Sequence, residues 1–66
     1  MIRVNGEHRA AMPARLIDLL TTEGVAERRR GIAVALNGTV VPRGRWGEVR
    51  LSPGDDIEIV KVLQGG

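Results

Sequence analysis

The residues that most clearly suggest a chemical role are the two glycines at the C-terminal end. The sequence finishes Leu63-Gln64-Gly65-Gly66, and with glycine at roughly 7% of average proteins such a pair arises by chance in about one chain in two hundred. A carboxylate that must enter a narrow site in another protein needs an extended, unbranched approach, and only glycine lacks a Cβ that would clash with the walls. We therefore expect Gly66 to present its carboxylate as a substrate, with Gln64 and Gly65 as the tail that leads to it.

The remaining side chains with catalytic potential do not assemble into a site of their own. The single histidine, His8, lies beside a predicted turn, and the adjacent Asp55 and Asp56 point apart at the entrance to a strand. The glycines around Trp46 are not followed by a helix with a Lys-Ser or Lys-Thr pair, so they predict no phosphate-binding loop. We expect no catalytic residue, no metal site and no cofactor bound by this chain.

Length, cysteine content and charge narrow the class of protein. The chain has 66 residues and no cysteine, which predicts one domain over residues 1–66 and excludes disulfide scaffolds, thiolate zinc sites and cysteine nucleophiles. Ten Lys and Arg against eight Asp and Glu leave a net charge of +2, and the one basic run, Arg28 to Arg30, is typical of a solvated loop. Since no stretch has the length of a membrane span, we expect a cytoplasmic protein that binds neither nucleic acid nor membrane.

The elements that would position the tail begin with a hairpin. Ile2 and Val4 alternate with polar residues, as in a half-buried strand, and the Asn-Gly pair that follows is a favoured hairpin turn. We expect the return strand to run through Ala10 and Ala11.

A short helix is predicted next, from about Pro13 to Glu23. Proline suits the first helical position because its missing N–H costs nothing there, and four apolar residues then gather on one face. Gly24 is the expected C-terminal stop, which would bring Val25 against Leu20 in a Schellman-type motif.

The second half of the chain predicts another hairpin and a central strand. Residues 32–36 alternate and lead through Asn37-Gly38 into a strand over residues 39–41. After a turn at Ser52-Pro53-Gly54-Asp55, the last strand, Ile57 to Val62, carries apolar residues on both faces, which favours a central position. The pattern predicts an α+β fold in which one helix covers one face of a mixed sheet, and Trp46 is expected to pack on the sheet edge or core.

The opposite face of this sheet is a candidate docking surface. If Ile57 and Ile59 face the helix, the residues between them face the other way, beside small alanines of the neighbouring strand. No second helix is predicted to cover that face, and it leads into the tail. An exposed apolar patch of this kind marks a partner site, and its expected residues are Ala33, Ala35, Glu58, Val60, Val62 and Leu63.

Several segments, taken in order, resemble one known family. They are Ile2-Arg3-Val4-Asn5-Gly6-Glu7, Gly31 to Gly38, Val40-Val41-Pro42-Arg43 with Trp46, Pro53-Gly54-Asp55, Ile57 to Val60, and Gly65-Gly66. Together they resemble the ThiS-type sulfur carriers of thiamine biosynthesis over nearly the whole chain. The resemblance implies a β-grasp, ubiquitin-like fold, for which we expect the last strand to lie parallel to the first. The residues expected beneath the helix are Ile2, Val4, Leu16, Leu20, Ile32, Val34, Leu36, Ile57 and Ile59.

The resemblance also implies the chemistry of the tail. An activating enzyme that uses ATP and Mg²⁺ would adenylate the carboxylate of Gly66, and a persulfide from a sulfur donor protein would convert it to a thiocarboxylate. Thiazole synthase would then accept the sulfur. On this reading the chain is a carrier and a substrate of partner enzymes, not an enzyme, and it is a monomer when free.

Three alternatives stay open at this point. The small subunit of molybdopterin synthase shares the fold and the Gly-Gly end but is usually longer, and a ubiquitin-like protein modifier would begin with the same end chemistry. From a different class, the segments around Asn37-Gly38 and Pro53-Gly54-Asp55 resemble part of an S4-type RNA-binding domain. That domain needs a basic helix, whereas Arg15 here is balanced by Asp18 and Glu23.

Overall fold

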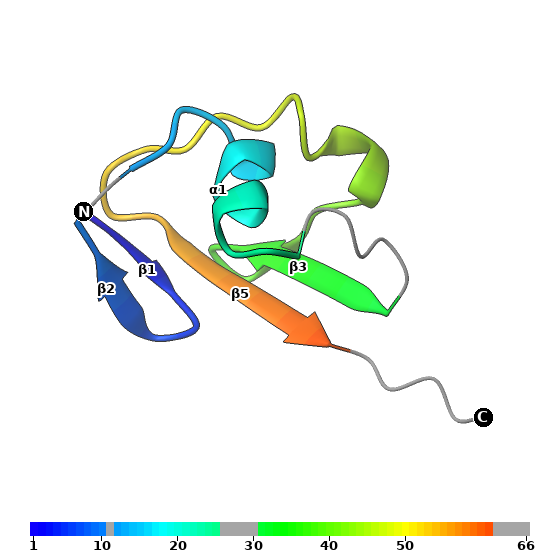
Figure 1. Cartoon of the computed structure of the whole chain (residues 1–66), viewed down its shortest axis with the longest axis horizontal. Coiled ribbons are helices and arrows are strands. Elements are labelled where there is room, and N and C mark those ends of the chain that lie inside the picture. Colours follow the sequence, from blue (N-terminus) through cyan, green and yellow to red (C-terminus); the bar gives the residue numbers. More distant parts are fainter. Residues whose placement is uncertain (11, 26–30, 62–66) are drawn as a thin grey trace.

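The computed structural model describes residues 1–10, 12–25 and 31–61. Within these ranges the chain forms five β-strands, one α-helix and one short 3-10 helix (Figure 1). In chain order these elements are β1 (Ile2–Val4), β2 (Glu7–Arg9), α1 (Leu16–Thr22), β3 (Ile32–Leu36), β4 (Thr39–Val40), η1 (Arg43–Arg45) and β5 (Asp56–Lys61).

The strands form one mixed sheet with β5 at its centre. Their order is β2-β1-β5-β3-β4, and β5 runs parallel to β1, with Val4 opposite Ile57, and antiparallel to β3, with Val34 opposite Ile59. This arrangement confirms the predicted central strand, its parallel pairing with the first strand, and the ubiquitin-like β-grasp architecture. The strand begins one residue earlier than predicted, at Asp56, and its predicted last residue, Val62, lies outside the described residues.

Both predicted hairpins are present, and their turns have the backbone conformation that Asn-Gly pairs favour. Asn5 and Gly6 have φ of 51° and 83°, and Asn37 and Gly38 have φ of 51° and 85°, as tight hairpin turns with two left-handed residues require. The prediction that the first return strand runs through Ala10 was wrong. β2 ends at Arg9, which lies opposite Ile2. The residue before Ile2, Met1, accepts the amide of Gly54 at its carbonyl at 2.8 Å and is not paired with Ala10 in the ladder, and Ala11 lies outside the described residues.

Helix α1 starts later than predicted. Arg15 is extended, with φ −128° and ψ 158°, and forms an isolated antiparallel bridge with Arg50. The amide of Leu16 also donates to the carbonyl of Val49 at 2.9 Å. Pro13 therefore does not open the helix, because the residues after it pair with a distant segment before the helix can begin.

The C-terminal end of α1 confirms the predicted Schellman motif. Gly24 has φ 79°, its amide donates to the carbonyl of Thr21 at 3.0 Å, and the amide of Val25 donates to the carbonyl of Leu20 at 3.0 Å. These are the two bonds that define the motif. Val25 and Leu20 both belong to the buried core.

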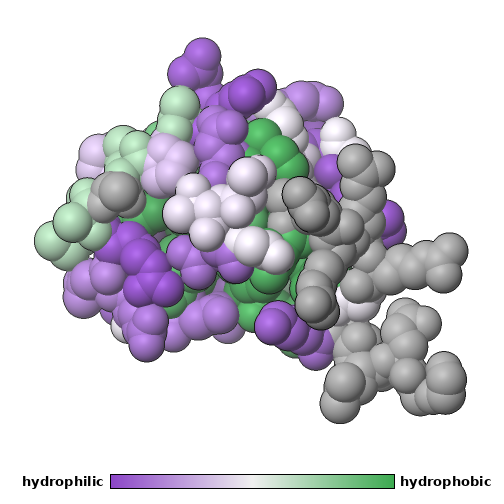
Figure 2. Space-filling view, viewed as in Figure 1, coloured by the Kyte–Doolittle hydropathy of each residue, from purple (hydrophilic) through white to green (hydrophobic). Residues whose placement is uncertain are grey.

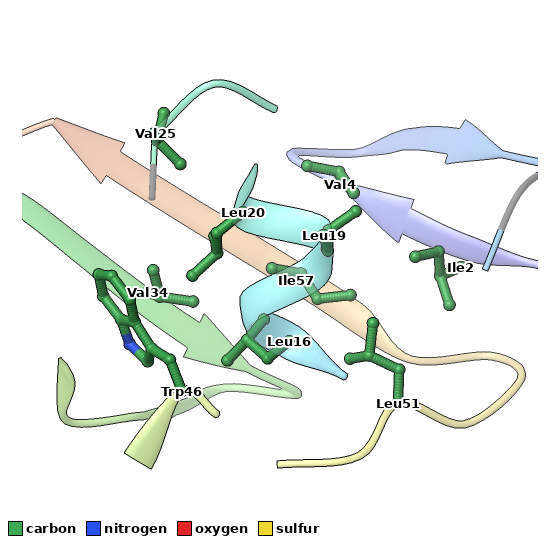
Figure 3. Packing of buried hydrophobic residues seen from close by; sticks show 10 residues of the cluster. All are labelled: Ile2, Val4, Leu16, Leu19, Leu20, Val25, Val34, Trp46, Leu51 and Ile57. Carbon is green, nitrogen blue, oxygen red and sulfur yellow. The ribbon is translucent and has the colours of Figure 1, made fainter. Parts of the chain in front are cut away.

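The core lies between α1 and the sheet (Figure 3). Its buried residues are Ile2, Val4, Leu16, Leu19, Leu20, Val25, Val34, Trp46, Leu51 and Ile57. Trp46 packs into this core as predicted, and its indole Nε1 donates to the carbonyl of Val41 at 3.0 Å.

Three residues that were predicted to be buried are only half-buried. Ile32, Leu36 and Ile59 pack against the core from its margin. Ile32 and Leu36 are the first and last residues of β3, and Ile59 lines an open hollow on the helix side of β5, so all three lie where the cover of the sheet is incomplete.

Polar side chains cover most of the face seen in Figure 2, with apolar residues visible between them. None of the described helices is long and apolar enough to span a bilayer.

Candidate functional site

The two faces of β5 differ in what covers them. Ile57 faces α1 and is fully buried, whereas Val60 faces away and is 53% exposed. Glu58 lies on the same outward side as Val60 and is also exposed. The alternation along the strand therefore has the predicted direction.

The strand register identifies the neighbours on that outward side. Ala35 lies opposite Glu58 on β5 and opposite Val40 on β4, and Ala33 lies opposite Val60. Val40 is 67% exposed. We call these five residues, Ala33, Ala35, Val40, Glu58 and Val60, the outer face.

Val40 is the one member of the outer face that the sequence analysis did not name. The signal was available, because a two-residue Asn-Gly turn fixes which residues of a hairpin lie opposite each other. Counting outward from Asn37-Gly38 pairs Leu36 with Thr39 and Ala35 with Val40, as the structure has them.

Charge borders the outer face on the side of β1. The guanidinium of Arg3 contacts the carboxylate of Asp56 at 3.2 Å, and His8 lies opposite Arg3 on β2. Among the described residues the structure records no ion pair to Glu58. The outer face thus places one carboxylate among valines and alanines.

In the sequence, β5 leads to the predicted tail and to two of the predicted docking residues. Val62, Leu63, Gln64, Gly65 and Gly66 lie outside the described residues. β5 is the element that precedes them in the sequence, so its anchoring sets the point from which the tail starts.

Two asparagine side chains anchor β5, one near each end. Asn5 Oδ1 accepts the backbone N–H of Ile59 at 2.7 Å, and Asn37 Oδ1 accepts the backbone N–H of Asp56 at 2.9 Å. Asn37 Nδ2 also donates to Asp55 Oδ1 at 3.0 Å. Sequence reasoning gave both asparagines a role in turns only, because a contact between residues 54 positions apart leaves no local signal.

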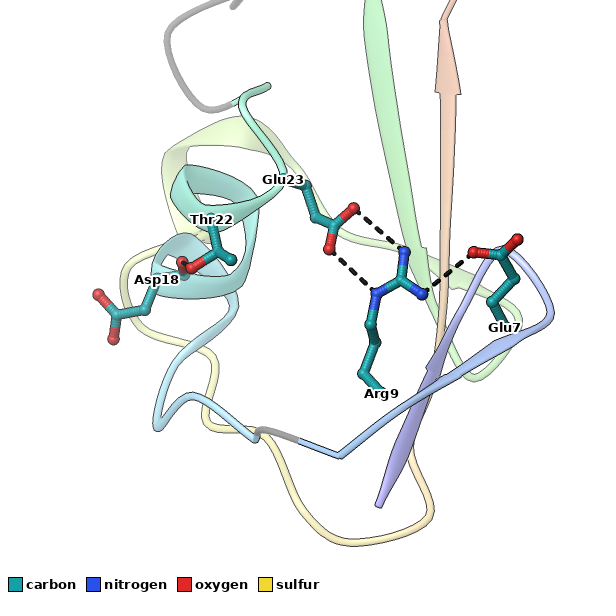
Figure 4. A network of polar contacts seen from close by, with 5 residues as sticks. All are labelled: Glu7, Arg9, Asp18, Thr22 and Glu23. Carbon is teal, nitrogen blue, oxygen red and sulfur yellow. Dashed lines mark hydrogen bonds and ion pairs between the residues drawn. The ribbon is translucent and has the colours of Figure 1, made fainter.

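On the helix side of β5, an open hollow of about 410 Å³ is lined by Asn5, Glu23, Val25, Ile59 and Lys61. Glu23, the acidic residue that lines this hollow, forms an ion pair with Arg9 (Figure 4). The guanidinium of Arg9 contacts the carboxylate of Glu23 at 3.3 Å and that of Glu7 at 3.1 Å. The hydrogen bond to Glu23 is the larger and that to Glu7 the smaller cause of a pKa of Arg9 above its ordinary value. The Arg9 contacts therefore tie β2 to the end of α1.

The acidic side chains and the histidine that the sequence analysis weighed lie apart from one another. Asp55 accepts the amide of Ser52 at 2.8 Å inside its turn, while Asp56 pairs with Arg3, so the two carboxylates are separately occupied as predicted. His8 is exposed. Within residues 1–10, 12–25 and 31–61, no three His, Cys, Asp or Glu side chains gather closely enough to hold a metal ion.

Comparisons with known proteins agree with one another. The ThiS family model matches residues 2–66. The sulfur carrier protein ThiS of Escherichia coli (strain K12) is 36% identical over 44 residues, which are 67% of this chain and 67% of that protein. The crystal structure of a thiamine biosynthesis protein (ThiS) from Geobacter metallireducens aligns with a TM-score of 0.76 at 28% identity, covering 98% of this chain and 97% of that one. An NMR solution structure of a thiamine biosynthesis protein from the same organism also gives 0.76 at 28% identity, covering 98% and 86%.

Proposed function

The chain belongs to the ThiS family, and from this membership we propose that it carries sulfur for thiamine biosynthesis as a thiocarboxylate on Gly66. The observation that carries the proposal is the family match, because it extends from residue 2 to residue 66 and so includes Gly65 and Gly66. Two glycines place no Cβ beside the reacting carboxylate, which suits entry into a narrow site.

The proposed chemistry begins with an activating enzyme that binds ATP and Mg²⁺. A carboxylate oxygen of Gly66 attacks the α-phosphorus of ATP, pyrophosphate leaves, and the carboxylate becomes a mixed anhydride with AMP. The terminal sulfur of a persulfide on a sulfur donor protein attacks the carbonyl carbon, and AMP leaves. A thiol then breaks the sulfur–sulfur bond and is oxidised to a disulfide, which leaves the thiocarboxylate on Gly66. Thiazole synthase accepts that sulfur.

In this scheme the chain is a carrier and a substrate of its partners. ATP and Mg²⁺ belong to the activating enzyme, so the chain contributes only its carboxylate and a surface that docks on the partner. The absence of cysteine from the sequence suits this role, because no thiol of the carrier itself can attack the activated carboxyl group.

We further propose that the partners dock on the outer face, together with Val62 and Leu63. Val40 and Val60 are the most exposed valines of the described residues, at 67% and 53%, and an exposed apolar patch of this kind marks a protein interface. Ala33 and Ala35 are small, so a partner can approach the sheet closely between the two valines. The patch lies on β3, β4 and β5, and β5 is the strand that leads to Gly66.

The comparisons favour thiamine synthesis over the alternatives. The curated relative and both solved relatives carry names from thiamine synthesis, which supports this reading over molybdopterin synthase and over a protein modifier. The RNA-binding alternative gains no support, because Arg15 on the approach to α1 contacts Asp18 at 3.4 Å and Glu23 contacts Arg9.

The proposal is tested by converting the Gly66 carboxylate to a thiocarboxylate in solution. Incubation with its activating enzyme, ATP, Mg²⁺ and inorganic sulfide should replace one carboxylate oxygen with sulfur, which intact-protein mass spectrometry detects. Deletion of Gly66, or a C-terminal tag appended after it, should abolish the product while the circular dichroism spectrum stays unchanged. A tagged protein that is still converted would place the reactive group elsewhere, and the mass of the protein from its native host provides an independent check.

A further inference from the structure

We propose that Asn5 is a positioning residue for the reactive end: its side chain fixes the last part of β5 and so sets the point from which the chain continues toward Gly66. This inference rests on the proposed function for its readout with the activating enzyme. It also predicts a structural effect that can be measured on the carrier alone.

The backbone pairing between β1 and β5 ends before β5 does. Val4 is the last residue of β1 and lies opposite Ile57. The amide of Asn5 donates to the carbonyl of Ile57 at 2.8 Å, after which the chain turns away at Gly6. The side chain of Asn5 then accepts the amide of Ile59 at 2.7 Å, so the side chain continues the pairing where the backbone can no longer do so.

The turn favours asparagine at position 5 but does not require it, because glycine is also common at this position of such turns. Asn5 has φ 51°, a conformation that glycine adopts more readily than asparagine. Glycine would therefore satisfy the turn but would leave the amide of Ile59 without its acceptor. An aspartate would satisfy both the turn and the amide.

Asn37 is a matched counterpart at the other end of the strand. It has the same φ of 51° and is followed by glycine in the same way. Its Oδ1 accepts the amide of Asp56, the first residue of β5. Removing either side chain thus takes one acceptor from β5, but only Asn5 acts on the end that leads to Gly66.

The loss of the Asn5 acceptor should weaken the hold of the sheet on the end of β5. Beyond Ile59, the pairing that the structure describes is with β3, where Ala33 lies opposite Val60 and Ile32 opposite Lys61. Without Oδ1, the amide of Ile59 turns to water and the end of β5 opens from the β1 side. The end of β5 is then held by β3 alone and frays more readily. Each frayed residue lengthens the segment between the fixed sheet and Gly66, which lowers the effective concentration of the carboxylate at a partner's active site.

The structural effect is tested by amide hydrogen exchange on Asn5→Gly and Asn37→Gly. Glycine removes the acceptor without adding strain to the left-handed turn. We expect exchange at Ile59 to be about tenfold faster in Asn5→Gly than in Asn37→Gly, and the reverse at Asp56. Equal exchange at Ile59 in the two variants would overturn the inference. If a glycine variant does not fold, Asn5→Asp takes its place, because aspartate keeps the acceptor oxygen and the turn: exchange at Ile59 should then stay within about twofold of the wild type, and a tenfold rise there would overturn the inference.

The functional effect is tested by steady-state adenylation of the full chain by its activating enzyme. Asn5→Gly should lower kcat about fivefold and leave KM within about twofold, because Asn5 lies outside the outer face and acts on the reach of the carboxylate. Asn37→Gly should change neither, and Asn5→Asp should restore kcat. Equal kcat for the two glycine variants would overturn the inference, whereas a wild-type protein that is not adenylated at Gly66 would overturn the proposed function instead.

Discussion

Val60 is the residue of the outer face on which the docking proposal can be tested most directly. It is 53% exposed although it lies on the central strand, where both faces of a sheet are commonly covered. Its neighbour across the sheet is Ala33, which is too small to shield it. A partner that covers this position removes valine surface from water at about 25 cal/mol per Å².

A charge at this position should therefore weaken docking. Val60→Asp places an unpaired carboxylate in a desolvated contact, and we expect binding to the activating enzyme to weaken by more than about 1 kcal/mol, as measured by isothermal titration calorimetry. Thr39→Asp is the control, because Thr39 is exposed and pairs with Leu36 on the helix side of the sheet. Equal affinities for the two variants would remove the outer face from the docking proposal.

At the scale of single elements, the end of α1 depends on one backbone conformation. Gly24 has φ 79°, and an added Cβ would meet no atom within 4 Å. A substitution there thus changes backbone strain without creating a clash, which separates two effects that usually occur together.

Gly24→Ala should destabilise the protein by about 1–2 kcal/mol, the cost of holding an L-residue in the left-handed region. Gly44→Ala is the matched control, because Gly44 has no positive φ and its added Cβ would also meet nothing within 4 Å. Urea unfolding followed by Trp46 fluorescence measures both. A Gly24→Ala protein as stable as Gly44→Ala would contradict this account of the helix end.

Elements with local signals could be predicted from the sequence, and those defined by distant contacts could not. Both hairpins follow from Asn-Gly turns between alternating residues, and the helix stop follows from Gly24. The start of α1 was misplaced because Arg15 bridges to Arg50, which no local pattern indicates. The direction of the outer face followed from the period of the strand, but the role of the Asn5 side chain depends on the parallel pairing of the first and last strands.

For the whole molecule, burial is uneven along the helix side of β5, where Ile59 lines an open hollow. Ile57 is fully buried beneath α1, whereas Ile59, two residues further along the same face, is only half-buried. The sequence predicts equal burial for both, and on that basis truncation of Ile59 to alanine would cost about 2–5 kcal/mol. In the structure only Ile57 is fully buried, so the larger loss of stability is expected at Ile57.

Ile57→Ala should lower the free energy of unfolding by about 2–5 kcal/mol, and Ile59→Ala by less than about 2 kcal/mol, because the loss scales with the buried surface and cavity that each truncation creates. Guanidinium unfolding of the two variants and the wild type makes the comparison directly. If Ile59→Ala is less stable than Ile57→Ala, the difference in burial between the two residues does not determine the stability loss, and this prediction is wrong.

The central place of the last strand has a consequence for how the chain acquires its structure. In the part of the chain that the structure describes, the β1–β2 and β3–β4 hairpins join the sheet only through β5, so neither can complete the sheet until β5 has been synthesised. Pairing the first strand with the last also closes a long loop, which slows folding relative to proteins with local contacts. A copy that ends before β5 thus loses its fold together with the proposed reactive residue, Gly66. Incomplete copies should fail as unfolded chains, which proteases remove, instead of competing with intact carriers for the partner enzymes.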